Sequence, residues 1–85
     1  MSYRLVYTHR AIKDIQKLEP AVKSRIGKAL HRFEADPLGY GKALTNTSLG
    51  SYRFRIGDYR IIFDLEEEEI VVLRVGHRRD IYKKG

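Results

Sequence analysis

Apolar and polar residues alternate from Ser51 to Phe63, with one break at Gly57-Asp58. This pattern predicts a β-hairpin with a two-residue turn. Glycine in the first turn position favours a type II′ turn, because that turn needs a positive φ there. The predicted register pairs Ile56 with Tyr59, Phe54 with Ile61 and Tyr52 with Phe63, and all six side chains share one face.

The other face of this hairpin carries Arg53, Arg55, Arg60 and Ile62, with Arg55 directly opposite Arg60. Like charges opposite each other on a sheet are destabilising by up to about 1 kcal/mol. An anion bound between the two arginines would explain the pairing. The alternative is a solvated sheet face, where exposed arginine is common.

The residues before the hairpin predict a short strand and two helices. The strand covers residues 3–7, and Thr8 is a suitable N-cap for the first helix. In that helix Ile12, Ile15 and Leu18 form one apolar stripe, which we expect in the core. Pro20 suits the first turn of the second helix, which ends at Asp36-Pro37. Residues 38–50 are rich in Gly, Ser, Thr and Asn and are expected to form a loop.

A further strand is predicted from Glu69 to Gly76, after an acidic turn. If Val71, Leu73 and Val75 face the helices, Arg74 lies on the open face with the other arginines, and the same alternation keeps Arg78 there. The chain is then a single domain over residues 1–85. Its fold class is α+β: a two-layer β-α-α-β-β-β domain whose mainly antiparallel, twisted sheet has two helices on one face and an open, basic, concave face on the other.

Charge and composition narrow the possible partners. The net charge is +6 and the pI is about 9.8, which favours a polyanion or an acidic protein as partner. The chain has no cysteine, which fits a cytoplasmic location. Its longest fully apolar run, residues 70–73, is too short to cross a bilayer, so no membrane association is expected. No metal-ligand spacing and no phosphate-binding glycine loop occurs, so we expect neither a metal nor another cofactor.

The remaining chemistry is an arginine-lined groove with His77 and Tyr82 at its edge. Arginine binds phosphate oxygens through paired N–H groups, and tyrosine can stack on a base. Histidine is suited to proton transfer near neutral pH. Together these residues suit metal-free RNA cleavage, in which the 2′-hydroxyl of the RNA attacks the neighbouring phosphate and arginines stabilise the added negative charge.

The chain resembles the RelE/ParE superfamily of small toxins, and most closely its RelE branch of ribosome-dependent mRNA interferases. The likeness runs from the first strand to Tyr82. Its three blocks are Ala11 to Leu18, Tyr52 to Phe63, and Val75-Gly76-His77-Arg78-Arg79-Asp80-Ile81-Tyr82. The resemblance implies a toxin of a type II toxin–antitoxin system that enters the ribosomal A site and cuts mRNA there. It also implies a cognate acidic antitoxin as partner.

The resemblance also implies roles for single residues. Arg60 and Arg78 match family arginines that contact the scissile phosphate, and Tyr82 matches a tyrosine that orients the substrate. Arg53 and Arg55 replace lysines of some members, so we expect them to act electrostatically. We take His77 as the leading proton carrier and Tyr82 as the second. The predicted catalytic residues are thus Arg55, Arg60, His77, Arg78 and Tyr82, and the predicted RNA-binding residues are Arg53, Arg55, Arg74, Lys83 and Lys84.

Three other functions remain open. A ParE-like toxin would poison DNA gyrase without cutting RNA. A non-catalytic RNA-binding module would bind through the same arginines but never cleave. A degenerate toxin would be inactive because arginines have replaced the lysines.

Overall fold

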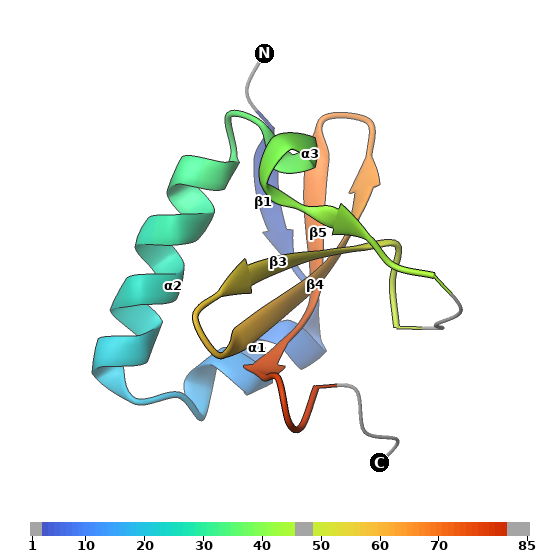
Figure 1. The fold of residues 1–85 in the computed structure, drawn as a ribbon. Helices are drawn as coiled ribbons and strands as arrows, with labels where there is room; N and C mark the ends of the chain where they lie inside the picture. Colours follow the sequence, from blue (N-terminus) through green and yellow to red (C-terminus); the bar gives the residue numbers. More distant parts are fainter. Residues whose placement is uncertain (1–2, 46–48, 82–85) are drawn as a thin grey trace.

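The protein folds into a five-stranded sheet with its two longer helices on one face (Figure 1). The structure is a computed structural model that describes residues 3–45 and 49–81. The elements in chain order are β1 (Arg4–Tyr7), α1 (His9–Gln16), α2 (Pro20–Phe33), α3 (Pro37–Tyr40), β2 (Lys42–Ala43), β3 (Tyr52–Ile56), β4 (Tyr59–Glu66) and β5 (Glu69–His77). The strand order is β1-β5-β4-β3-β2. Only the β1–β5 pairing is parallel.

The expected α+β fold class is confirmed, and the loop predicted for residues 38–50 contains two additional elements. Asp36 caps the short helix α3 by accepting a hydrogen bond from the Gly39 N–H at 3.1 Å. Strand β2 then pairs with the outer edge of β3. The hydrophobic pattern did not reveal them because α3 has four residues and β2 has two, which is about one period of each pattern and too short for a repeat.

The helix signals are confirmed in their main features. The Thr8 hydroxyl accepts a hydrogen bond from the Ala11 N–H at 3.1 Å, which caps α1. Pro20 opens α2, whose regular turns end at Phe33, a few residues before the predicted boundary. The expectation that Ile12 is a core residue is wrong: its side chain is 42% exposed, and the small neighbour Ala11 is buried in its place.

The core lies between α2 and the sheet. Phe54 and Phe63 stack with ring centroids 4.0 Å apart, and Phe33 of α2 approaches Phe54 at 4.6 Å. The remaining core residues are aliphatic and come from α1, α2 and the sheet, namely Ala11, Ile26, Ala29, Leu30, Ile61, Ile70, Val72 and Val75.

The predicted alternation along β5 is wrong over its first half because of a β-bulge. Ile62 pairs with Arg74, but Phe63 pairs with Val72, so Leu73 is an extra residue without a partner across the β4–β5 ladder. The bulge reverses the side-chain alternation before it. Ile70 and Val72 therefore enter the core, while Val71 and Leu73 are only partly buried. The Leu73 carbonyl accepts a hydrogen bond from the Thr8 hydroxyl at 3.2 Å.

Candidate nucleic-acid interface

The hairpin register agrees in every pair with the prediction. Ile56 lies opposite Tyr59, Phe54 opposite Ile61, and Arg55 opposite Arg60. Gly57 has a φ of +58°, and Asp58 has no positive φ, which fits a type II′ turn. Figure 1 shows the turn that joins β3 and β4, and the register places the two facing arginines one pair before it.

Arg60 is held beneath this turn. Only 9% of the residue is exposed, and its Nη1 donates to the carbonyls of Gly57 and Tyr59, each at 3.0 Å. Arg55, directly opposite, is exposed. One arginine therefore braces the turn with a fixed positive charge, while the other is accessible to a ligand.

Arg78 reaches the same turn from the C-terminal end of the described chain. Its backbone N–H donates to the Asp58 carbonyl at 2.7 Å, and its Nε lies 3.7 Å from the Asp58 carboxylate. The Arg78 side chain is 53% exposed. An exposed ion pair of this length contributes little to stability, so a phosphate could replace Asp58 as the partner of Arg78 at small cost.

Arg25 of α2 is a fourth cation at this turn, and the sequence analysis did not identify it. A Cβ placed on Gly57 would lie 2.7 Å from Arg25 Nη2, which places this guanidinium against the turn. No signal in the sequence points to the contact, because α2 and the turn meet only through tertiary packing. The turn arginines are the set that the fold brings together: Arg25, Arg55, Arg60 and Arg78.

The open face away from the turn is partly covered. A Cβ on Gly50 would lie 2.7 Å from Ile62 Cγ2 and 2.8 Å from Leu73 Cδ1, so the chain before β3 lies directly over these side chains. The Ser51 N–H donates to Asp64 at 2.7 Å and fixes this cover, and Ile62 is fully buried. Arg53 lies beyond it, opposite Ile62 and beside Lys42 of β2. The broad basic trough that we expected is therefore a smaller surface centred on the turn.

Arg74 binds a carboxylate of α1 and is not one of the turn arginines. It lies opposite Ile62 in the register, but its Nε donates to the Asp14 carboxylate of α1 at 2.8 Å. The same carboxylate accepts the Val75 N–H at 3.0 Å. Asp14 thus ties α1 to the part of β5 that extends beyond β1, and Arg74 has an internal partner.

His77 lies on the helix side of the sheet. His77 pairs with Tyr59, and this pair lies on the same face as the next-but-one pair, Ile61 and Val75, which are core residues. The intervening pair, Arg60 and Gly76, lies on the opposite face. The rings of Tyr59 and His77 meet edge to face, with centroids 5.5 Å apart. The sequence analysis placed His77 at the edge of the arginine-lined groove, and the structure places it on the side of the sheet opposite to Arg60. Tyr82, Lys83 and Lys84 lie outside the described residues.

Two structural expectations concern metal ions and membranes. Within residues 3–45 and 49–81, no three His, Asp or Glu side chains are grouped in a way that could hold a metal ion. None of the helices in that part of the chain combines the length and apolar character needed to cross a membrane.

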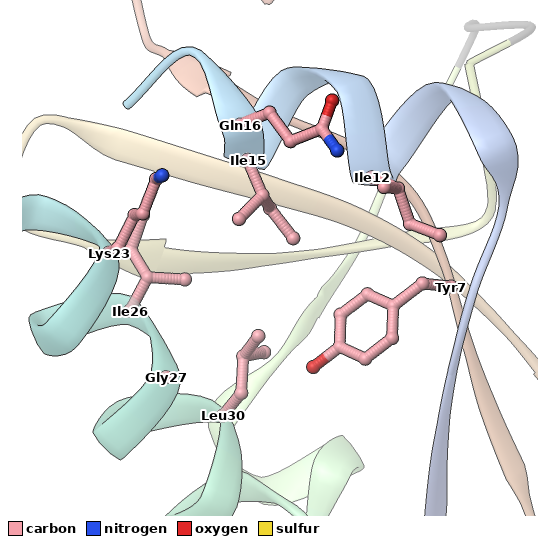
Figure 2. A pocket seen from close by; sticks show the side chains of 8 residues that line it. All are labelled: Tyr7, Ile12, Ile15, Gln16, Lys23, Ile26, Gly27 and Leu30. Carbon is pink, nitrogen blue, oxygen red and sulfur yellow. The ribbon is translucent and has the colours of Figure 1, made fainter. Parts of the chain in front are cut away.

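A second surface feature is an apolar groove between β1, α1 and α2. Figure 2 shows Tyr7, Ile12, Ile15 and Leu30 pointing into it, with Lys23 and Gln16 at its rim. Its volume is about 300 Å³. Burial raises the pKa of the Tyr7 phenol, and the nearby Glu34 carboxylate adds to this effect. Tyr7 and Ile12, 38% and 42% exposed, leave an apolar surface open to solvent here.

The chain is similar to known toxins over nearly its full length. A family model described as the ParE toxin of the type II toxin-antitoxin system parDE matches residues 5–82. Toxin RelG of Mycobacterium tuberculosis is 33% identical over 87 residues, covering 99% of this chain and 100% of that protein.

Solved structures of several toxins share the fold, among them the toxin chains of two toxin–antitoxin complexes. In the crystal structure of the toxin-antitoxin complex RelBE2 from Mycobacterium tuberculosis, the matching chain is 30% identical with a TM-score of 0.83, covering 92% of this chain and 100% of that one. In the archaeal RelE-RelB complex from Pyrococcus horikoshii OT3, the values are 26% and 0.75, with coverage of 94% and 99%. This chain therefore belongs to the RelE/ParE superfamily and is a toxin of a type II toxin–antitoxin system.

Proposed function

We propose that this toxin is a ribosome-dependent mRNA endonuclease that cuts mRNA in the ribosomal A site and so inhibits translation. The observation that carries the proposal is the convergence of Arg25, Arg55, Arg60 and Arg78 on one hairpin turn. Arginines held together at the end of a sheet suit a phosphate that gains negative charge in a transition state.

In the proposed reaction, the 2′-oxygen of the RNA attacks the adjacent phosphorus and the bond from phosphorus to the 5′-oxygen breaks. The 2′-hydroxyl proton leaves to a base and the 5′-oxygen gains a proton, so the products are a 2′,3′-cyclic phosphate and a 5′-hydroxyl. Arg55 and Arg78 would contact the phosphate, and Arg60 would add its fixed charge from beneath the turn. We assign proton transfer to Tyr82, the second of the two proton carriers expected from the sequence, because His77 lies on the side of the sheet opposite to Arg60.

Cleavage of mRNA on programmed ribosomes tests this proposal. We expect wild-type toxin to produce cyclic-phosphate ends, and we expect Arg55→Ala and Arg78→Ala to lower kcat by about a hundredfold each, the usual effect of removing one donor to a transition-state charge. Lys13→Ala changes an exposed cation on α1, far from the turn in the chain, and should leave the rate unchanged. Full rates in both arginine variants would remove the turn from the chemistry.

The gyrase-poisoning alternative is favoured by one observation, which is that the matching family model is described by the ParE name. A supercoiling assay with purified gyrase separates the two functions. Inhibition of gyrase with no cut mRNA would replace our proposal. Weakened RNA binding in Arg78→Ala with no cleavage by the wild type would instead support a non-catalytic RNA-binding module or an inactive toxin.

We also propose an acidic antitoxin as partner, with an amphipathic segment seated in the groove of Figure 2. The groove offers apolar side chains flanked by Lys23, and the chain carries a net charge of +6, so an apolar segment with acidic flanks complements it. Ile12→Glu should weaken antitoxin binding at least tenfold, as expected for a charge placed in an apolar contact, without changing mRNA cleavage by free toxin. Unchanged affinity would place the antitoxin elsewhere.

A further inference from the structure

Gly27 lies near the middle of α2, and nothing in the described part of the free toxin requires a glycine there. Glycine in a helix interior is destabilising relative to alanine, because it loses more conformational entropy on folding. A Cβ placed on Gly27 would meet no atom of the described chain within 4 Å, apart from its chain neighbours and the nearby backbone of α2. Its φ is not positive, so an L-residue fits this backbone conformation. The free toxin would therefore be more stable with alanine at this position.

The other glycines that the structure describes have an internal reason to lack a side chain. A Cβ on each of them would lie 3.2 Å or less from another atom of the toxin. At Gly41 the obstacle is the Phe63 ring at 2.8 Å, and at Gly76 it is Ile81 Cδ1 at 3.2 Å. Gly27 is the exception among the described glycines, so its missing side chain points to a contact that the free toxin does not make.

Gly27 belongs to the wall of the apolar groove. Figure 2 shows it on α2 beside Ile26 and Leu30, across the groove from Ile15 of α1 and Tyr7 of β1. The wall opposite α2 carries large apolar side chains, whereas α2 presents only main-chain atoms at Gly27. The distance between two packed elements depends on the side chains at their contact. A segment in the groove can therefore approach α2 more closely at Gly27 than at the residues beside it.

We infer that Gly27 is a specificity-determining contact point for the antitoxin, an inference that rests on the proposed seating of the antitoxin in this groove. A segment of the antitoxin crosses α2 directly over Gly27 and packs against its main-chain atoms. Lys23, one turn earlier on the same face, is exposed and suits an acidic side chain beside this contact. The glycine lowers the stability of the free toxin and admits a closely packed partner.

The test compares Gly27→Ala and Gly27→Leu with the wild type, and the probe is a small acidic protein encoded next to the toxin, taken as its antitoxin. Both variants should fold, because the position is open in the free toxin. Gly27→Ala should raise the melting temperature of free toxin by about 4 °C, as expected for a helix-interior glycine replaced in a domain of this size. Antitoxin binding should weaken about tenfold in Gly27→Ala and about a hundredfold in Gly27→Leu, because the added atoms overfill a close contact.

Ala21→Leu is the matched control, since it adds bulk to an exposed position of α2 that does not line the groove. It should leave the affinity for antitoxin unchanged. A lower melting temperature in Gly27→Ala would show that the fold itself requires the glycine. Full affinity in Gly27→Leu would show that no partner packs on it. Either result would overturn the inference.

Ile12→Glu, on the opposite wall, separates this inference from the proposed seating of the antitoxin. Weakened binding in Ile12→Glu with full affinity in both Gly27 variants would keep the antitoxin in the groove and reject the contact at Gly27. Full affinity in Ile12→Glu with weakened binding in Gly27→Leu would instead place the antitoxin on α2 outside the groove and retain the contact. Full affinity in all of these variants would reject both.

Discussion

At the residue scale, the environment of a side chain mattered more than its type. Arg60 and Arg74 belong to the same sheet, yet Arg60 braces a turn and Arg74 is paired with Asp14. Ile12 is as apolar as Ile26, but Ile12 lines an open groove while Ile26 is buried. Each difference arises from a neighbour that is distant in sequence.

Glu67 is the one non-glycine residue with a positive φ among those described, at +56° in the β4–β5 turn. A positive φ costs an L-residue about 1–2 kcal/mol, and glycine at this position would remove that cost. Glycine also loses more conformational entropy on folding, which offsets part of the stabilisation. We expect Glu67→Gly to raise the free energy of unfolding by about 0.5–1 kcal/mol. Urea denaturation followed by circular dichroism measures it.

The matched control is Glu68→Gly, in the same turn but without a positive φ. It should lower the free energy of unfolding, because glycine there brings only the entropic cost. Equal effects of the two substitutions would show that the turn conformation at Glu67 carries no strain.

Tyr7 gives a pH-dependent prediction. Burial, and then the Glu34 carboxylate, raise its pKa above the ordinary value of 10.0 in the folded state. The folded protein thus holds the phenolic proton more tightly than the unfolded chain. The contribution of this proton to stability is complete below pH 10.0 and is lost as the pH rises through the folded-state pKa.

The comparison is between wild type and Tyr7→Phe, which cannot ionise. The difference in free energy of unfolding between them should stay constant below pH 10.0 and shift in favour of the variant above it. Urea denaturation across this range measures both proteins. Parallel curves throughout would mean that Tyr7 ionises equally in both states.

At the scale of elements, the bulge in β5 and the capping of its edge shape the site. Leu73 interrupts the ladder, so residues before and after it follow opposite alternations. β1 pairs with β5 only as far as Val72, so the edge of β5 beyond that residue has no neighbouring strand. There the Asp14 carboxylate of α1 accepts a hydrogen bond from the Val75 N–H. Both features lie in the part of β5 that leads to His77 and Arg78.

Asp14→Asn tests this tie between α1 and β5. The side chain of Asp14 is only 10% exposed, and hydrogen bonds to a charged group contribute about 1.5–3 kcal/mol, so we expect a loss of about 2 kcal/mol in the free energy of unfolding. Arg10→Gln is the control, since the Arg10 side chain is 59% exposed and its Nε lies 3.8 Å from the Asp14 carboxylate, so this pair should contribute less than about 0.5 kcal/mol. A double-mutant cycle with Arg74→Gln should give a clear coupling energy, and additive effects would contradict the tie.

At the scale of the whole molecule, basic residues occur throughout the chain, and four arginines gather at the β3–β4 turn. The net charge of +6 attracts any polyanion, while the fold brings cations from α2, the hairpin and the C-terminal turn to one end of the sheet. The apolar groove lies between the two helices and β1, so the proposed RNA and antitoxin surfaces share α2, which contributes Arg25 to the turn and Ile26 and Leu30 to the groove.

The salt dependence of RNA binding distinguishes a cation that meets phosphate from one that does not. With a non-cleavable single-stranded RNA, Arg78→Gln should reduce the slope of log K against log salt by about 0.7, the value of one phosphate contact. Arg74→Gln should leave the slope unchanged, because Arg74 is engaged by Asp14. A reduced slope in Arg74→Gln would show that Arg74 contacts RNA, as predicted from the sequence.

The sequence alone determined what depends on local pattern: the hairpin with its turn and register, the helix starts at Thr8 and Pro20, and the placement of Arg55 opposite Arg60. Alternation and capping act between residues close in the chain, so these features can be read from it directly. Only the tertiary structure decided that Arg25 joins the turn, that Arg74 leaves it, and that His77 lies on the far side. Those outcomes depend on a bulge and on contacts between distant elements, whose partners no local pattern identifies.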